Sequence, residues 1–191
     1  MKKSIPFISF DDNRNDMIII SVHGRSGQGV ESTLNLIANA LQGTGLNAQI
    51  LFFPAAEKRG SYTYGLVKAD KSQLLSRQLE PSDITLIFDT SLQIKEILAN
   101  AKEKSLLFVN SKDKIAYPEL KKKHLKCYVL DATGISIAAG AKALPNLPLL
   151  GALAKNFNKI TMKSLKAGVE LFAKDGGLLI EEGYKNVKLV K

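Results

Sequence analysis

Apolar runs and stripes of helical period alternate along most of this chain. The run from Ile18 to Val22 is typical of a buried strand, and a glycine-rich turn follows it. Apolar residues then recur every three or four positions, which predicts a helix with one buried face (Val30, Leu34, Ile37, Ala38 and Leu41). This helix is expected to end near Gly43 to Gly45, and a second strand is predicted from Ala48 to Phe53, before Pro54. The spacing is that of a parallel βαβ unit.

The alternation continues towards the C-terminus. Apolar runs predict further strands over residues 62–69, 84–89, 105–109 and 126–130. The helices between and after them are predicted from the residues at their starts. Thr90 or Ser91 is expected to cap the first and Thr161 the last long one, Pro118 lies in a first turn, Thr133 opens another helix, and a further helix begins near Leu149. The helix after Thr90 should reach about Ala101, and the one after Thr161 has an apolar face (Met162, Leu165, Val169 and Phe172). One more short helix is expected after Gly176.

The order of these elements predicts the fold class. Residues 1–16 are predicted to be an N-terminal extension, and residues 17–191 a single α/β domain without a linker or a repeat. Because strands and helices alternate almost throughout, we expect a three-layer, mostly parallel, Rossmann-like sheet with helices on both faces.

The glycine turn is the most informative stretch. Gly24, Gly27 and Gly29 allow a tight strand-to-helix turn and the close approach of another surface. The helix that follows presents unpaired N–H groups, where an anion or a carbonyl-rich partner can bind. The alternative interpretation, which stays open, is that the glycines only allow the tight turn and bind no ligand or partner.

Two common nucleotide motifs are a poor match to this turn. A P-loop needs Lys and then Ser or Thr after its last glycine, but Val30 and Glu31 occupy those positions, which argues against nucleotide hydrolysis. A dinucleotide fingerprint has the order Gly-x-Gly-x-x-Gly, whereas here the order is Gly-x-x-Gly-x-Gly, so NAD and FAD are not favoured.

Charge and composition exclude several other classes. The net charge of +9 comes mostly from dispersed lysines, and the densest run, Lys121 to Lys123, is interpreted as the solvated end of a helix, so nucleic-acid binding is not favoured. No apolar run is long enough for a membrane-spanning helix, and no signal-peptide core is present, so a cytoplasmic location is expected. The single cysteine, Cys127, is predicted to be a buried thiol, and one cysteine cannot hold an iron–sulfur cluster.

Other candidate residues have two interpretations each. His23 ends the first strand and could face a ligand, although a packed histidine is favoured. Asp89, Asn110 and Asp131 end successive strands, where they could bind a ligand or, more commonly, cap a helix. The loop from Glu57 to Gly60 could clamp a partner or an anion, or could be a solvated turn.

Four of these motifs, in this order, resemble the gamma subunit of the 2-oxoacid:ferredoxin oxidoreductases, the pyruvate and ketoisovalerate family. They are the Gly24–Val30 turn, Pro54 with Glu57-x-Arg59-Gly60, the Ser82-Asp83 entry to a strand, and Asn146 followed by Leu150-Gly151-Ala152-Leu153. The resemblance covers roughly residues 17–175. Ser26 and Ser61 stand where the family usually has glycine; both replacements are small enough to keep the turn, but they can alter the ligand contact made there.

The resemblance implies a non-catalytic subunit of a larger enzyme. Such complexes oxidise a 2-oxoacid to acyl-coenzyme A and reduce ferredoxin or flavodoxin. It implies that alpha, beta and delta-type partner subunits carry thiamine diphosphate, Mg and iron–sulfur clusters, that coenzyme A is a substrate, and that this chain alone binds no cofactor or metal and is inactive. A homodimer of the isolated chain is left open, and no nucleic acid or membrane is expected.

The resemblance also suggests which residues face coenzyme A or a neighbouring subunit. They belong to the glycine turn, to the Glu57–Gly60 loop after the second strand and to the later motif that begins at Asn146. They are Gly24, Arg25, Ser26, Gly27, Gln28, Gly29, Glu57, Arg59, Gly60 and Asn146. The alternative function is a free-standing module that binds a nucleotide or phosphate ligand at the turn.

Overall fold

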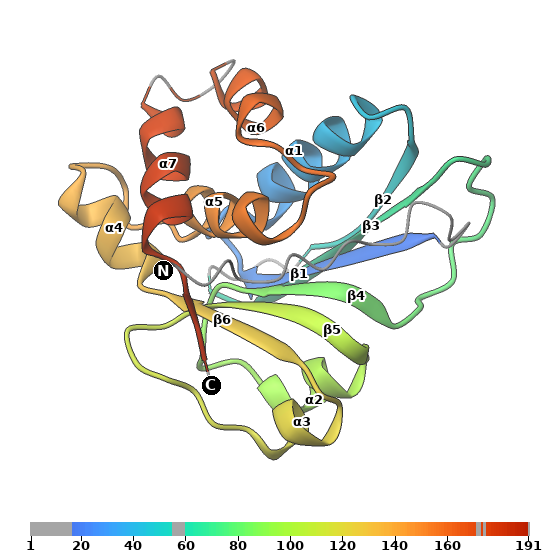
Figure 1. Cartoon of the computed structure of the whole chain (residues 1–191), viewed down its shortest axis with the longest axis horizontal. Coiled ribbons are helices and arrows are strands. Elements are labelled where there is room, and N and C mark those ends of the chain that lie inside the picture. Colours follow the sequence, from blue (N-terminus) through green and yellow to red (C-terminus); the bar gives the residue numbers. More distant parts are fainter. Residues whose placement is uncertain (1–16, 55–59, 171–172, 174, 191) are drawn as a thin grey trace, which may run out of the picture.

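The computed structural model describes residues 17–54, 60–170, 173 and 175–190, so the predicted N-terminal extension lies outside the described residues. Within these described residues, seven strands form one sheet in the order β2-β3-β1-β4-β5-β6-β7 (Figure 1). Their bounds are β1 Ile18–Arg25, β2 Asn47–Phe53, β3 Tyr62–Asp70, β4 Ser82–Ile87, β5 Ala101–Asn110, β6 Lys126–Leu130 and β7 Lys188–Leu189. The helices are α1 Val30–Gln42, α2 Ile94–Ala99, α3 Pro118–Lys122, α4 Ala132–Ala138, α5 Asn146–Asn156, α6 Met162–Val169 and α7 Gly176–Asn186.

The predicted α/β class with a mostly parallel sheet is confirmed. Strands β1, β4, β5 and β6 form a parallel core, while β3 and β7 are antiparallel to their neighbours. Strands β1 and β2 run in the same direction, as the βαβ spacing indicated, but β3 lies between them and pairs with both. The first crossover therefore connects strands that are not neighbours.

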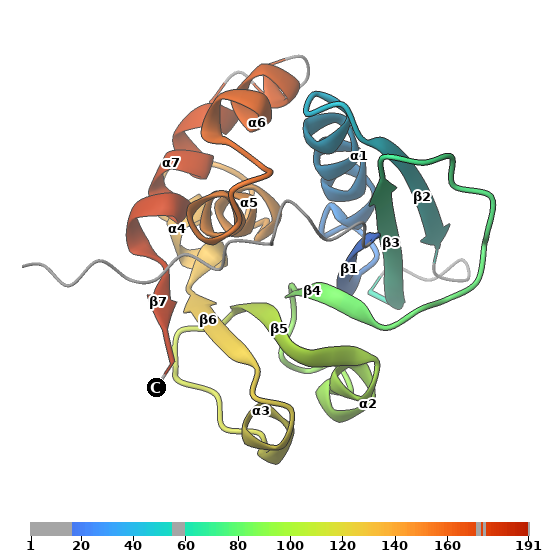
Figure 2. The same ribbon diagram turned by 45° about the vertical axis from the view of Figure 1, so that its right-hand side comes forward.

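Helices cover the two faces of the sheet unequally. Helices α1, α5, α6 and α7 lie over one face, where the main core is built around buried residues such as Leu34, Phe88, Phe108 and Leu150 (Figure 1). Helices α2 and α3 cover the other face beside β4, β5 and β6, with a smaller core that includes Leu98. Within the described part of the chain, no helix covers this second face over β1, β2 and β3 (Figure 2).

Several helix starts differ from the prediction. Helix α2 begins at Ile94 and has no side-chain cap, because Ser91 bonds Asp89 and Arg25 instead. The N-cap of α4 is Asp131, whose carboxylate accepts from the Gly134 N–H at 2.9 Å, so the helix starts before Thr133. Helix α5 begins at Asn146 rather than near Leu149.

The remaining helix starts agree with the sequence. Pro118 is the first residue of α3. Thr161 caps α6 in a reciprocal capping box with Ser164, and a further helix, α7, begins at Gly176 as expected. Helix α6 ends at Val169, and Phe172, which was assigned to its apolar face, lies outside the described residues.

The interpretation of Lys123 as part of a solvated helix end is wrong. Its ammonium group donates to the carbonyl oxygens of Leu98, Ala99 and Ala101 at 2.7 to 2.9 Å. These carbonyls belong to the end of α2 and the start of β5, where a cation is favoured by the helix dipole. Lys121 and Lys122 are exposed, as predicted.

Candidate functional site

The glycine turn is open to solvent at its tip. Strand β1 continues to Arg25, so Gly24 belongs to the strand, and a Cβ there would lie 2.9 Å from Val30 Cγ2. Ser26 and Gly27 are exposed, and Gly27 and Gly29 have φ of 94° and 85°. Gly29 is the N-cap of α1 and supplies no side-chain acceptor, so the N–H groups of the first turn remain available to a ligand or a partner.

Arg25 connects three segments at the end of β1. Its Nε donates to Asp89 Oδ2 at 2.7 Å, its Nη1 to the Gly60 carbonyl at 2.9 Å, and its Nη2 to Ser91 Oγ at 2.6 Å. Burial opposes ionisation of Asp89, but hydrogen bonds from Ser91 and Arg25 outweigh it and hold the pKa of this carboxyl below its usual value. The guanidinium group is therefore engaged within the protein and positions the loop at Gly60 rather than standing free for an anion.

The loop after β2 lies against the glycine turn. The Ser26 N–H donates to the Ser61 carbonyl at 2.9 Å, and Gly60 has a φ of 83°. Two parts of the predicted site, which are separated by α1 and β2 in the sequence, therefore form one surface. Glu57 and Arg59, which were also assigned to this surface, lie outside the described residues.

Asn146 reaches the same turn from the start of α5. Its side chain is buried and lies so close to Gly29 that a Cβ on that glycine would be 2.6 Å from Asn146 Nδ2. The amide also donates weakly to Ser32 Oγ at 3.4 Å. Gln28 supports the turn from the other side, because its Oε1 accepts from the Arg25 N–H at 2.7 Å. The structure thus brings together all the predicted site residues that it describes.

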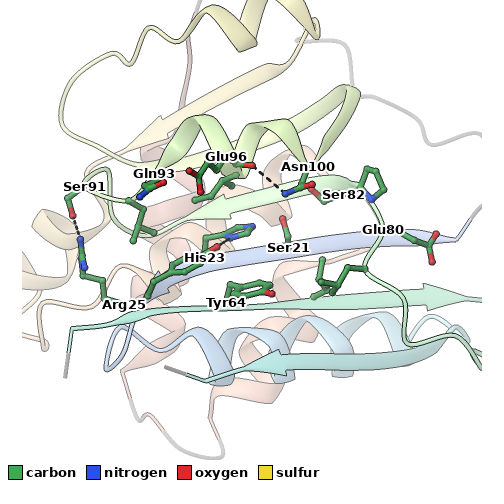
Figure 3. Close-up of a pocket in the computed structure, with 16 residues that line it drawn as sticks. Ser21, His23, Arg25, Tyr64, Glu80, Ser82, Ser91, Gln93, Glu96 and Asn100 are labelled. Carbon is green, nitrogen blue, oxygen red and sulfur yellow. Dashed lines mark hydrogen bonds between the residues drawn. The ribbon is translucent and has the colours of Figure 1, made fainter. Parts of the chain in front are cut away.

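A pocket of about 580 Å³ opens on the uncovered face of the sheet (Figure 3). Strands β1 and β3 supply Ser21, His23, Tyr62 and Tyr64, and α2 supplies Glu96 opposite them. Arg25 and Ser91 also line the pocket, so it adjoins the glycine turn. Sequence reasoning missed the two tyrosines, although alternate residues along one strand share a face and Tyr62 and Tyr64 follow that spacing.

His23 is both packed and part of the pocket lining, so the two interpretations of it are not exclusive. The residue is 8% exposed, its Nδ1 lies 2.8 Å from the Tyr62 hydroxyl, and its ring is nearly parallel to those of Tyr62 and Tyr64. Burial lowers the pKa of His23 to about 4. Burial, followed by the charges of Tyr64 and Glu96, raises the pKa of Tyr62 to about 12. Both groups are therefore neutral hydrogen-bonding groups near pH 7.

The pKa of His23 makes stability depend on pH in a defined direction. Because the folded pKa of about 4 lies below the unfolded value of 6.5, the unfolded chain binds the proton first as the pH falls, and this stabilising contribution is lost from pH 6.5 towards pH 4. We expect this group alone to lower the free energy of unfolding by about 2 kcal/mol between about pH 7 and pH 5, measured by urea denaturation.

The variant His23→Gln should lose this part of the pH dependence. The matched control is His124→Asn, which removes the exposed histidine and should keep the wild-type slope. A His23→Gln protein with the full wild-type slope would contradict the assignment.

The strand-terminal polar residues have structural roles here. Asn110 Nδ2 donates to the Phe88 carbonyl at 2.9 Å and to Thr133 Oγ1 at 2.8 Å, and Asp131 caps α4. Among the described residues, no group of three or more His, Cys, Asp or Glu side chains could hold a metal ion. Cys127 is buried, and burial raises the pKa of its thiol to about 12. None of the described helices is long and apolar enough to span a membrane.

Comparisons with known proteins point to one family. The sequence model described as "Pyruvate ferredoxin/flavodoxin oxidoreductase" matches residues 19–190. The chain is 30% identical over 159 residues to the pyruvate/ketoisovalerate oxidoreductases common subunit gamma of Thermococcus kodakarensis, covering 81% of this chain and 85% of that one. It is 26% identical to pyruvate synthase subunit PorC of Thermotoga maritima, covering 78% of each chain.

Two solved structures share the fold. The crystal structure of pyruvate oxidoreductase subunit PORC from Thermotoga maritima superposes with a TM-score of 0.78 at 24% identity, covering 92% of this chain and 99% of that one. The 2-oxoglutarate:ferredoxin oxidoreductase of Magnetococcus marinus, with 2-oxoglutarate, coenzyme A and succinyl-CoA bound, has a TM-score of 0.71 at 22% identity. That match covers 88% of this chain and 29% of the longer one.

Proposed function

Because the chain belongs to the pyruvate ferredoxin/flavodoxin oxidoreductase family, we propose that it is the gamma subunit of a multi-subunit 2-oxoacid:ferredoxin oxidoreductase. The complex converts a 2-oxoacid and coenzyme A to acyl-coenzyme A and carbon dioxide, and it passes two electrons to ferredoxin or flavodoxin. The observation that carries the proposal is the family match over residues 19–190 of a chain whose length is close to that of known gamma subunits.

The redox and carbon chemistry belongs to the partner subunits in this proposal. Thiamine diphosphate with Mg would supply the carbanion stabilisation, and iron–sulfur clusters would carry the electrons. The single cysteine of this chain is buried in β6, so the chain's own residues do not fit a cluster, which needs about four thiolates. The partners are alpha, beta and delta-type subunits, and the isolated chain is inactive.

The surface formed by the glycine turn and the loop at Gly60 would face coenzyme A or a neighbouring subunit. Ser26 and Gly27 are exposed at its tip, and the N–H groups at the start of α1 favour an anionic group such as a phosphate. Arg25 would hold the Gly60 carbonyl and the Asp89 turn in place, so that the surface keeps its shape when the partner or ligand binds.

The test is a bulky substitution at the tip of the turn in the assembled complex. In a complex expressed with its alpha, beta and delta-type subunits, Ser26→Trp should raise the KM for coenzyme A about tenfold or weaken assembly by a similar factor. Gln73→Trp, at an exposed position outside this surface, should change neither. The readouts are acyl-coenzyme A formation with ferredoxin reduction and native mass spectrometry.

Two results would contradict parts of this proposal. An unchanged KM for coenzyme A together with unchanged assembly would show that the glycine turn faces neither coenzyme A nor a neighbouring subunit. Failure of the wild-type chain to associate with any partner subunit would overturn the assignment as a gamma subunit.

A further inference from the structure

Among the described residues, strand β2 lies at one end of the sheet, and no strand pairs with its outer edge. It is the first strand in the sheet order, and all seven of its residues pair with β3 in continuous register on the other side (Figure 2). The outer N–H and C=O groups of such a strand form a template that another extended strand can complete.

The strand lacks the usual features that prevent edge pairing. Residues 47–53 contain no proline, no charged residue and no bulge. Charged side chains, prolines and bulges are the devices by which terminal strands normally avoid one another. Leu51 and Phe53 are half-buried and lie on the face that no described helix covers, so apolar surface accompanies the free edge.

The charge distribution identifies which partner suits this edge. The protein carries a net charge of +9, yet no residue from Ser32 to Pro54 is charged. The exposed residues of α1 beyond its first turn, Asn35, Asn39 and Gln42, are neutral as well, and the exposed charge of the helix is Glu31 in its first turn. Two copies of a strongly positive protein repel one another, and the electrostatic repulsion between them is smallest when they approach through a neutral surface. An acidic partner would gain nothing from this surface.

The strand is also complementary to itself. An antiparallel pairing with Ile50 opposite Ile50 of the second copy places Gln49 opposite Leu51 and Ala48 opposite Phe52. Residues directly opposite each other in an antiparallel pair lie on the same face of the sheet. In this register Gln49 and Leu51 therefore share one face of the joined sheet, and Ala48 and Phe52 share the other. No like charges meet at any position.

We infer that two copies of this chain associate through an antiparallel β2–β2 pairing about a two-fold axis, which joins their sheets into one continuous sheet. This association goes beyond the proposed function, because it concerns the isolated chain and needs no partner subunit. It predicts an unusual response to salt. Screening weakens the repulsion between two positive bodies, so the dimer becomes tighter as salt rises, whereas a charge-driven association becomes weaker.

The test uses the full-length purified chain in sedimentation equilibrium at about 0.05 and 0.5 M NaCl. The wild type should be a dimer whose dissociation constant falls as salt rises. Leu51→Lys should be monomeric, because the lysines of the two copies would lie diagonally across the strand pair, about 7–8 Å apart, and their positive charges would repel each other. The control is Leu75→Lys, at a leucine that is 80% exposed outside the edge, and it should remain dimeric.

A charge exchange separates pairing from misfolding. Leu51→Glu alone should also be monomeric, and an equimolar mixture of Leu51→Lys and Leu51→Glu should recover the dimer, which two unfolded chains cannot do. Hydrogen exchange of the β2 amides in the wild type should slow as protein concentration rises. A monomeric wild type at both salts, a dimer unaffected by Leu51→Lys, or β2 amides protected only in the presence of another subunit would overturn the inference.

Discussion

Replacing Gly29 by alanine is expected to lower the free energy of unfolding by about 3 kcal/mol. Gly29 has a φ of 85°, a conformation that costs an alanine about 1 kcal/mol or more. The added Cβ would also lie 2.6 Å from Asn146 Nδ2 and 2.9 Å from Asn146 Cγ, so this buried side chain would have to move. Both effects act at the N-cap of α1, at the centre of the proposed surface.

Urea denaturation of three variants separates the two effects. Asn146→Ala in the Gly29→Ala background removes the steric overlap and should restore about 2 kcal/mol, leaving the backbone cost. The matched control is Gly27→Ala, which has a similar φ of 94° but no atom within 4 Å of the added Cβ, so it should show the backbone cost alone. Equal losses for Gly29→Ala and Gly27→Ala would contradict the contact with Asn146.

The local parts of the fold could be read from the sequence because they depend on neighbouring residues. The turn at Gly27 and Gly29, the first residue of α3 and the cap at Thr161 follow from backbone conformation and short-range hydrogen bonds. Starts without a strong local cap, such as those of α2 and α5, were misplaced by about three residues.

The order of the strands could not be read in the same way. The spacing of β1, α1 and β2 fixes the direction of the two strands, but not which strand lies between them. Strand β3 enters that position because it pairs with both β1 and β2 along its length, and this pairing depends on residues far apart in the sequence. As a result, β1 lies inside the sheet, between β3 and β4. Its glycine turn follows the carboxyl end of this strand.

The candidate site shows the same division. The resemblance to the family grouped Arg25, Gly60 and Asn146, and the structure places all three at the glycine turn. The contact of Arg25 with Asp89 and the stacking of His23 with Tyr64 depend on pairing between strands, for which a single sequence carries little signal. Lys123 was misinterpreted because a run of lysines gives no indication of which one turns inwards.

The buried ion pair between Lys68 and Glu80 is the second place where a single substitution should have a large effect. The Lys68 side chain is completely buried on β3, and its Nζ donates to Glu80 Oε1 at 2.8 Å. Glu80 belongs to the segment between β3 and β4 and lines the pocket. Removing the carboxylate leaves a buried ammonium group without its partner, which costs far more than the pair contributes.

Glu80→Ala is therefore expected to lower the free energy of unfolding by about 3 kcal/mol, at the low end for such pairs because the Glu80 side chain is 36% exposed. Lys68→Met, an apolar side chain of similar length, should cost about 1 kcal/mol or less, and the double variant should recover most of the loss. Urea denaturation measures all three. Since Glu80 forms one wall of the pocket, hydrogen exchange in residues 77–81 should also be faster in Glu80→Ala than in the double variant. A double variant as unstable as Glu80→Ala would show that the carboxylate stabilises the segment by itself, independently of the buried ammonium group.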